Sequence, residues 1–91
     1  MTMQKLFNET LNSIFSDFQN TLEDRFTRNE KDQAVYTAKQ QMIGAYKLLT
    51  KIASQQIIES CEQDLKKSIE KVYDTVGWNY IYSHYDTVFL I

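Results

Sequence analysis

Proline is absent and glycine occurs only twice in these 91 residues. An average chain of this length would contain about five prolines and about six glycines. Both residues interrupt or weaken helices, so their scarcity favours long, continuous helices. It also excludes glycine-rich phosphate-binding loops, and it leaves no flexible linker, so residues 1–91 are expected to form one domain. Gly44 falls inside a predicted helix, where we expect it at a close approach between two helices.

Cysteine occurs once, as Cys61, so the chain cannot form an internal disulfide. A lone cysteine is typical of a reducing compartment. The first ten residues lack the continuous apolar segment of a secretory signal. The longest apolar run, residues 88–91, is far below the ~20 residues that span a bilayer. We therefore expect a cytoplasmic protein that does not enter a membrane.

Histidine and tryptophan also occur once each, and residue types that carry catalysis are scarce. Ser83, His84 and Asp86 contain the side chains of a hydrolytic triad, but working triads gather residues from separate parts of a fold. No His, Cys or carboxylate spacing matches a zinc or calcium site. Cys61 is interpreted as a small apolar core residue. The chain is therefore predicted not to be an enzyme, and neither a cofactor nor a metal is expected.

Apolar residues in the first third of the chain recur at steps of three and four, which predicts a helix over 3–26. They are Met3, Phe7, Leu11, Ile14, Phe15, Phe18, Leu22 and Phe26. The pattern repeats after 11 residues, at about 3.67 residues per turn, so the apolar stripe runs nearly straight along the helix. The stripe is expected to pack in the core, with part of it available to another chain.

A second apolar stripe predicts a helix over 28–58, and Thr27 and Glu30 fit a capping box at its start. Its members are Val35, Ala38, Met42, Ala45, Tyr46, Leu49, Ile52, Ala53 and Ile57. From Cys61 onward the apolar face is rotated by about 120°, which one straight helix cannot keep on a single core. We place a break at 59–61, where Ser60 fits a second capping box, and a third helix over 61–76. A continuous helix with two faces remains the alternative.

Residues 79–91 are rich in β-branched and aromatic side chains around the polar stretch 83–86, which predicts a β-hairpin. Its strands are expected to cover the helices of their own chain or to pair with another molecule. Gly77 is expected to end the third helix. Aromatic residues are frequent interface hot spots. The candidate interface residues are Phe7, Phe15, Phe18, Phe26, Trp78, Tyr80, Tyr82, Tyr85 and Phe89.

The predicted fold class is mainly α: a long antiparallel helical hairpin, a shorter third helix and a small C-terminal β-hairpin. Helices over 3–26 and 28–58 would be about 36 Å and about 45 Å long. A compact chain of this size has a diameter near 30 Å. Such helices would overhang a monomer, which favours a homodimer.

The leading functional hypothesis is a non-enzymatic, self-associating interaction module that binds and modulates a larger protein. A small chain rich in Asn, Ile, Lys and Tyr suits a regulator or inhibitor carried as an accessory factor by a phage or mobile element. An alternative is a nucleic-acid or nucleotide binder that uses Lys39, Lys47 and Lys51 together with tyrosines. The net charge of −2 gives that alternative no general support. A structural or assembly subunit is a further alternative.

Overall fold

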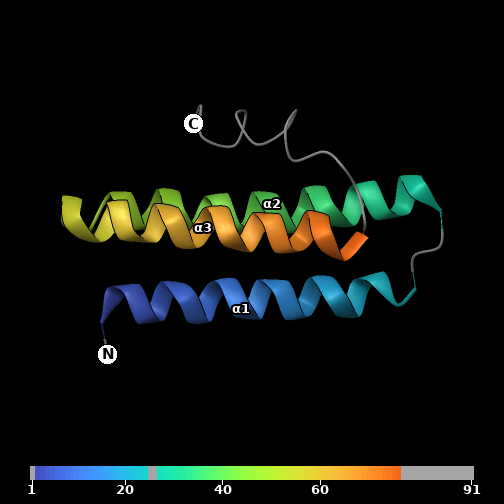
Figure 1. Cartoon of the computed structure of the whole chain (residues 1–91), viewed down its shortest axis with the longest axis horizontal. Coiled ribbons are helices and arrows are strands. Elements are labelled where there is room, and N and C mark those ends of the chain that lie inside the picture. The colour runs from blue at the N-terminus through green and yellow to red at the C-terminus, as the bar shows by residue number, and fades with distance from the viewer. Residues whose placement is uncertain (1, 25–26, 77–91) are drawn as a thin grey trace.

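A computed structural model describes residues 2–24 and 27–76, and these residues fold into three helices. The helices are α1 (Met3–Leu22), α2 (Arg28–Thr50) and α3 (Gln55–Val76). Helices α1 and α3 run in the same direction, and α2 runs antiparallel to both (Figure 1). Each helix contacts the other two, so the arrangement is a three-helix bundle. In the described part of the chain all regular structure is helical, which confirms the mainly α prediction. The hairpin predicted over 79–91 lies outside the described residues.

The three helices have nearly equal lengths of 20, 23 and 22 residues. The prediction of a long hairpin with a shorter third helix is therefore wrong, because α3 is longer than α1. At 1.5 Å per residue the helices measure about 30, 35 and 33 Å. They lie side by side over most of their length (Figure 1), so no long helix overhangs the others. This removes the argument that led to the predicted homodimer, and the dimer itself stays a prediction.

The first two helices begin at threonine caps. The Thr2 hydroxyl oxygen accepts a hydrogen bond from the Lys5 backbone N–H at 3.1 Å. At α2 the Thr27 hydroxyl oxygen accepts from the Glu30 N–H at 3.2 Å, and the Thr27 N–H donates to Glu30 Oε1 at 3.2 Å. These two bonds form the capping box predicted from the sequence.

The break between α2 and α3 lies at residues 51–54, earlier than the predicted break at 59–61. Ser54 caps α3: its hydroxyl oxygen accepts from the Ile57 N–H at 3.4 Å, and its carbonyl oxygen accepts from the Ile58 N–H at 3.0 Å. Ser60, the predicted cap, lies inside α3. The chain reverses direction at residues 51–54. The apolar stripe before this turn and the rotated stripe after it therefore belong to separate helices, and each stripe can face the common core.

The core combines one stripe from each helix. Its buried members are Phe7, Leu11 and Phe18 of α1, Ala34, Val35, Ala38, Met42, Ile43 and Leu49 of α2, and Cys61, Leu65, Ile69, Val72 and Tyr73 of α3. Three members of the 11-residue repeat are thus buried, and Ile14, Phe15 and Leu22 pack against them. The repeat is mainly an intramolecular packing surface. Its first member, Met3, is 38% exposed.

Gly44 lies on the solvent side of α2, and a Cβ atom built there would meet nothing within 4 Å. The expected close approach between helices at this glycine is therefore wrong. Without a neighbour to accommodate, glycine at this position carries only its conformational cost to the helix.

Candidate protein-binding surface

The aromatic residues predicted to form an interface do not lie together on one exposed surface. Phe7 and Phe18 are buried in the core, at 4% and 3% exposure. Phe15 is half-buried, and Lys71 Nζ lies 4.4 Å from the centre of its ring. Phe7 and Phe18 are therefore core residues, and Phe15 is partly covered within its own chain. The other candidates, Phe26, Trp78, Tyr80, Tyr82, Tyr85 and Phe89, lie outside the described residues.

Aliphatic side chains, rather than aromatic ones, form an exposed apolar surface at one end of the bundle. Met3 and Leu6 of α1 are 38% and 54% exposed, and Leu48 and Ile52, at the end of α2, are each 63% exposed. They line one groove of about 170 Å³, whose lining residues are Met3, Leu6, Phe7, Thr10, Ala45, Leu48, Leu49 and Ile52. We call these eight residues the apolar end patch. Four partly exposed aliphatic side chains in one groove need an explanation beyond scattered surface hydrophobicity.

Helical periodicity and the antiparallel packing of α1 and α2 bring these residues together. On α1 the edge of the groove repeats at Met3, Leu6 and Thr10, in steps of i, i+3 and i+7 that stay on one side of a helix. The opposite edge is formed by Ala45 and Leu48 of α2, at i and i+3, and by Ile52 in the turn that follows α2. Phe7 and Tyr46 pack with their ring centroids 6.3 Å apart, which aligns the two helices at this level. Phe7 and Leu49, both buried, form the floor.

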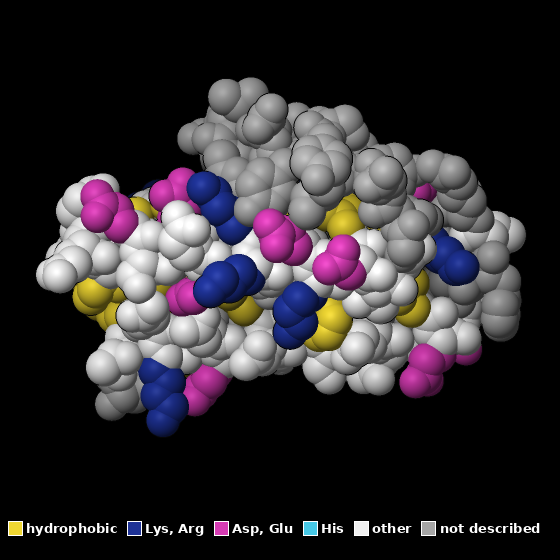
Figure 2. Space-filling model, viewed as in Figure 1, with side chains coloured by type: hydrophobic (Ala, Val, Ile, Leu, Met, Phe, Trp, Pro, Cys, Tyr) yellow, Lys and Arg dark blue, Asp and Glu magenta, His cyan; other side chains and the backbone are white. Residues whose placement is uncertain are grey.

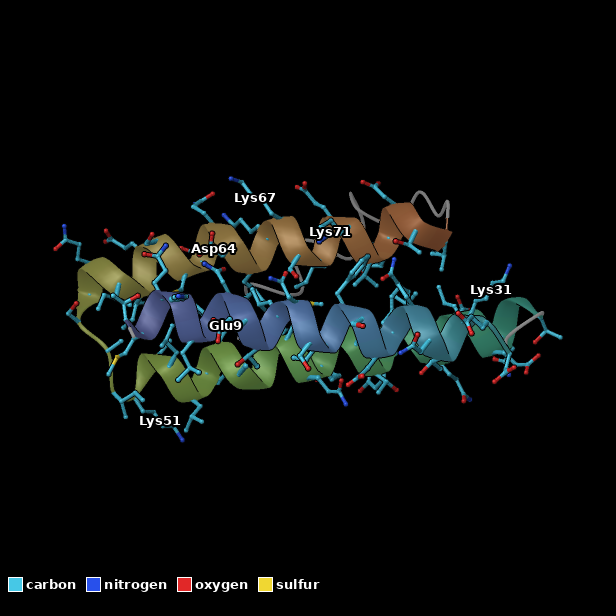
Figure 3. All side chains as sticks on the ribbon, turned by 90° about the horizontal axis from the view of Figure 1, so that it is seen from below. Glu9, Lys31, Lys51, Asp64, Lys67 and Lys71 are labelled. Carbon is cyan, nitrogen blue, oxygen red and sulfur yellow. The ribbon has the colours of Figure 1, made fainter. Side chains whose placement is uncertain are left out.

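Most of the charged residues close in sequence to the apolar end patch are lysines. On α1 and α2, the charged residues within four positions of a patch residue are Lys5, Glu9, Lys47 and Lys51. All four are exposed. In Figure 3, Glu9 lies on α1 and Lys51 lies at the end of α2. Lys5 and Lys47 each stand two residues from a groove residue, Met3 and Ala45, and are therefore turned to another side of their helices.

The three lysines proposed to contact a polyanion do not form one surface. Lys47 and Lys51 are exposed and lie about 40° apart around α2. Lys39 is rotated by about 80° from Lys47 and by about 120° from Lys51. It is half-buried, and this burial lowers the pKa of its ammonium group from the usual 10.5. The structure therefore groups Lys47 with Lys51 and separates Lys39 from both.

The groove between α1 and α3 has a different character. Asn8, Asn12, Asp64, Lys67, Ser68 and Lys71 line it together with Leu11. On the α1–α3 side of the molecule, basic and acidic side chains are interspersed (Figure 2), with Asp64, Lys67 and Lys71 along α3 (Figure 3). This groove lacks a continuous apolar floor and a field of one sign, so it is the weaker candidate for binding.

Chemical sites are not evident within residues 2–24 and 27–76. Cys61 is fully buried, and burial, with a smaller effect of Asp64, raises the pKa of its thiol. A buried thiol with a raised pKa is a poor nucleophile. In this part of the chain no three His, Cys, Asp or Glu side chains are placed to hold a metal ion. Ser83, His84 and Asp86 lie outside it.

Leu6 and Leu48 were missed by the sequence prediction because neither belongs to the apolar stripe of its helix. Each is a large aliphatic residue on a side that is otherwise polar, and that departure from the pattern was the available signal. Ile52 was assigned to the buried face of a continuous helix. Because α2 ends at Thr50, Ile52 falls in the turn and is exposed.

Comparison with known proteins found no relative of this chain. No protein-family model matches the chain, no curated protein matches its sequence, and no solved structure matches its fold. None of the described helices has the length and hydropathy required to cross a membrane. Function has to be argued from the surface of the bundle itself.

Proposed function

We propose that this chain is a non-enzymatic interaction module that binds a larger protein through the apolar end patch and modulates it. The observation that carries the proposal is the grouping of four exposed aliphatic side chains, Met3, Leu6, Leu48 and Ile52, in one groove. Keeping such side chains in water costs free energy that a partner recovers on binding. These residues come from α1, from α2 and from the turn after α2, and their convergence on one groove favours a shared role for them.

The free energy gained by covering these four side chains is too small to hold a partner by itself. Burying a fully exposed Leu, Ile or Met contributes ~1.5–3 kcal/mol, so covering these four partly exposed side chains contributes roughly 3–6 kcal/mol. Association costs at least about 4 kcal/mol in lost translational and rotational freedom. The apolar end patch therefore serves as the centre of a contact that also needs polar partners around it.

The test is affinity capture with a matched pair of variants. Leu6→Gln with Leu48→Gln makes the apolar end patch polar at two exposed positions, where the fold should tolerate the change. Tyr36→Gln is the control, because Tyr36 is 62% exposed on α2 but does not line this groove. A partner should be captured by the wild type and by Tyr36→Gln and lost with the double variant. Equal capture by all three proteins, with unchanged circular dichroism, would contradict the proposal.

A further inference from the structure

We infer that two copies of this chain exchange α3, and that residues 28–76 of each copy then form one continuous helix. The surface that receives the exchanged helix is the one on which α3 already packs, so the structure itself shows its occupant. Helix α3 contacts both α1 and α2. Its buried apolar residues are Cys61, Leu65, Ile69, Val72 and Tyr73. An exchanged pair makes the same contacts between two chains and closes as a symmetric dimer.

The turn between α2 and α3 departs little from a helix. Lys51 has helical backbone angles, with φ −85° and ψ −18°. The Ala53 N–H donates to the Leu49 carbonyl oxygen, four residues before it, at 3.0 Å. The same pattern resumes where the Ile58 N–H donates to the Ser54 carbonyl oxygen at 3.0 Å. The backbone therefore has to change over only a few residues for the two helices to become one.

The residues of this turn do not impose a reversal of the chain. Positions 51–54 hold neither glycine nor proline, and among them only Ser54 is of a type common in turns. Ile52 is 63% exposed there. A continuous helix would replace the Ser54 cap by four hydrogen bonds, from the N–H groups of residues 54–57 to the carbonyl groups of residues 50–53. The turn of the single chain is thus held by the packing of α3 on α1 and α2.

That packing is the same in the exchanged pair. The core keeps one stripe from each of three helices, and the bond from Gln4 to Ser60 joins two chains instead of one. Exchange buries one side of a whole helix twice over, which is an interface of the obligate kind rather than a single groove. Because association costs translational and rotational freedom, the pair is favoured at high protein concentration.

Cross-linking between two variants tests the exchange directly. One protein carries Gln4→Cys and the other Ser60→Cys, both with Cys61→Ala, because the Gln4 amide nitrogen lies 2.6 Å from the Ser60 hydroxyl oxygen. The two are unfolded together and refolded at high concentration, and a short bis-maleimide should then link them into a covalent dimer. Glu59→Cys in place of Ser60→Cys is the control, since Glu59 is exposed and rotated by about 100° from Ser60. No covalent dimer, or an equal amount with Glu59→Cys, would overturn the inference.

A proline at the start of α3 separates exchange from ordinary dimerisation. Gln55 is the first residue of α3, a position where proline is compatible with a helix. Inside a continuous helix the same proline would remove a hydrogen bond and clash with the preceding turn. Gln55→Pro should therefore reduce the cross-linked dimer about tenfold or more, and Gln55→Ala should not reduce it. Equal amounts with both variants would show that the helix does not straighten, and would also overturn the inference.

The same two cysteines placed in one chain show whether each variant still folds. Gln4→Cys with Ser60→Cys should cross-link within a single chain in the Gln55→Pro protein, at a concentration too low for exchange. The exchange and the proposed function fail separately, because α1 and α2, which carry the apolar end patch, stay together in either state. Loss of the covalent dimer leaves capture through Leu6 and Leu48 untouched, and loss of that capture leaves the exchange untouched.

Discussion

The side-chain amide of Gln4 donates a hydrogen bond to the Ser60 hydroxyl oxygen at 2.6 Å. The same nitrogen lies 3.2 Å from Asp64 Oδ2, so one residue of α1 is joined to two successive turns of α3. These contacts hold together the ends of two helices that are 56 and more residues apart in sequence. They lie at the same end of the bundle as the apolar end patch, and they help to fix the position of α1 there.

Replacing Gln4 by Ala should therefore destabilise the bundle. A net loss of about 0.5–1.5 kcal/mol is expected, because the part-buried acceptors of Ser60 and Asp64 lose their donor. Urea unfolding followed by circular dichroism measures the change. Gln40→Ala is the matched control, since Gln40 is exposed on α2. Equal midpoints for both variants would show that the α1–α3 hydrogen bonds add nothing to stability.

Gly44→Ala should have the opposite effect. The position is helical and exposed, and an added Cβ meets no neighbour within 4 Å. Alanine then gains about 0.5–1 kcal/mol from helix propensity with no steric penalty. The thermal midpoint should rise by several degrees for a domain of this size. A lowered midpoint would mean that Gly44 contacts something else in solution, such as a second chain.

The position of the turn between α2 and α3 can be tested at its cap. Ser54→Ala removes the side-chain acceptor at the start of α3 and should cost about 1 kcal/mol. The same substitution at Thr27 should cost a similar amount, because it dismantles the capping box of α2. Thr37→Ala, at an exposed position inside α2, serves as the reference. If Ser54→Ala matches the reference in urea unfolding, the turn is not capped at Ser54.

Cys61 should be unreactive in the folded protein. Its side chain is fully buried, and its raised pKa keeps the thiol protonated at neutral pH. Labelling with a disulfide reagent should proceed only through unfolding, and it should accelerate with denaturant. The comparison protein is Cys61→Ala with Gln40→Cys, which places a single thiol at an exposed helical position. Equally fast labelling of both proteins would contradict the burial of Cys61.

Alkaline pH should destabilise the bundle. Burial raises the pKa of Cys61 above its usual 9.0 and the pKa values of Tyr46 and Tyr73 above their usual 10.0. The unfolded chain therefore releases these protons first, so the stabilising contribution is complete below about pH 9 and is lost as the pH rises through the raised values. Lys39 acts in the opposite direction, because its lowered pKa makes stability rise as the pH approaches 10.5.

The variant Cys61→Ala isolates one part of this profile. Its loss of stability should begin near pH 10, where tyrosine titrates, whereas the wild type should begin to lose stability near pH 9. Chemical denaturation at half-unit intervals from pH 7 to pH 11 gives the two curves. Identical curves would show that Cys61 has the same pKa in the folded and unfolded chains.

Local features of the fold could be read from the sequence with good accuracy. The 11-residue repeat identified the buried side of α1, and Thr27 with Glu30 identified the start of α2 to the residue. These succeed because helical periodicity and capping depend on neighbours within one or two turns. The start of α3 was misplaced because Ser60 fits a capping box locally, whereas the helix is capped at Ser54. Only the packing of the third stripe on the other two decides between them.

The binding surface could not be predicted in the same way. Leu6 and Leu48 are far apart in sequence, and each is an isolated departure from the pattern of its own helix. The aromatic residues drew attention instead, yet Phe7 and Phe18 are buried in the core. Composition indicates which side chains are suited to an interface, but exposure is a property of the assembled bundle.

The sequence by itself determined that the part of the chain that the structure describes is helical, which apolar stripes face inward, and that glycine-rich loop chemistry is excluded, because these follow from residue types and short spacings. Tertiary structure alone decided that the helices form a bundle of three nearly equal members, and that Leu6 lies in one groove with Leu48 and Ile52. It also decided that Lys39 is half-buried, whereas Lys47 and Lys51 are exposed. Each of these depends on how the helices are rotated and aligned against one another, and that alignment is fixed by packing between residues distant in sequence.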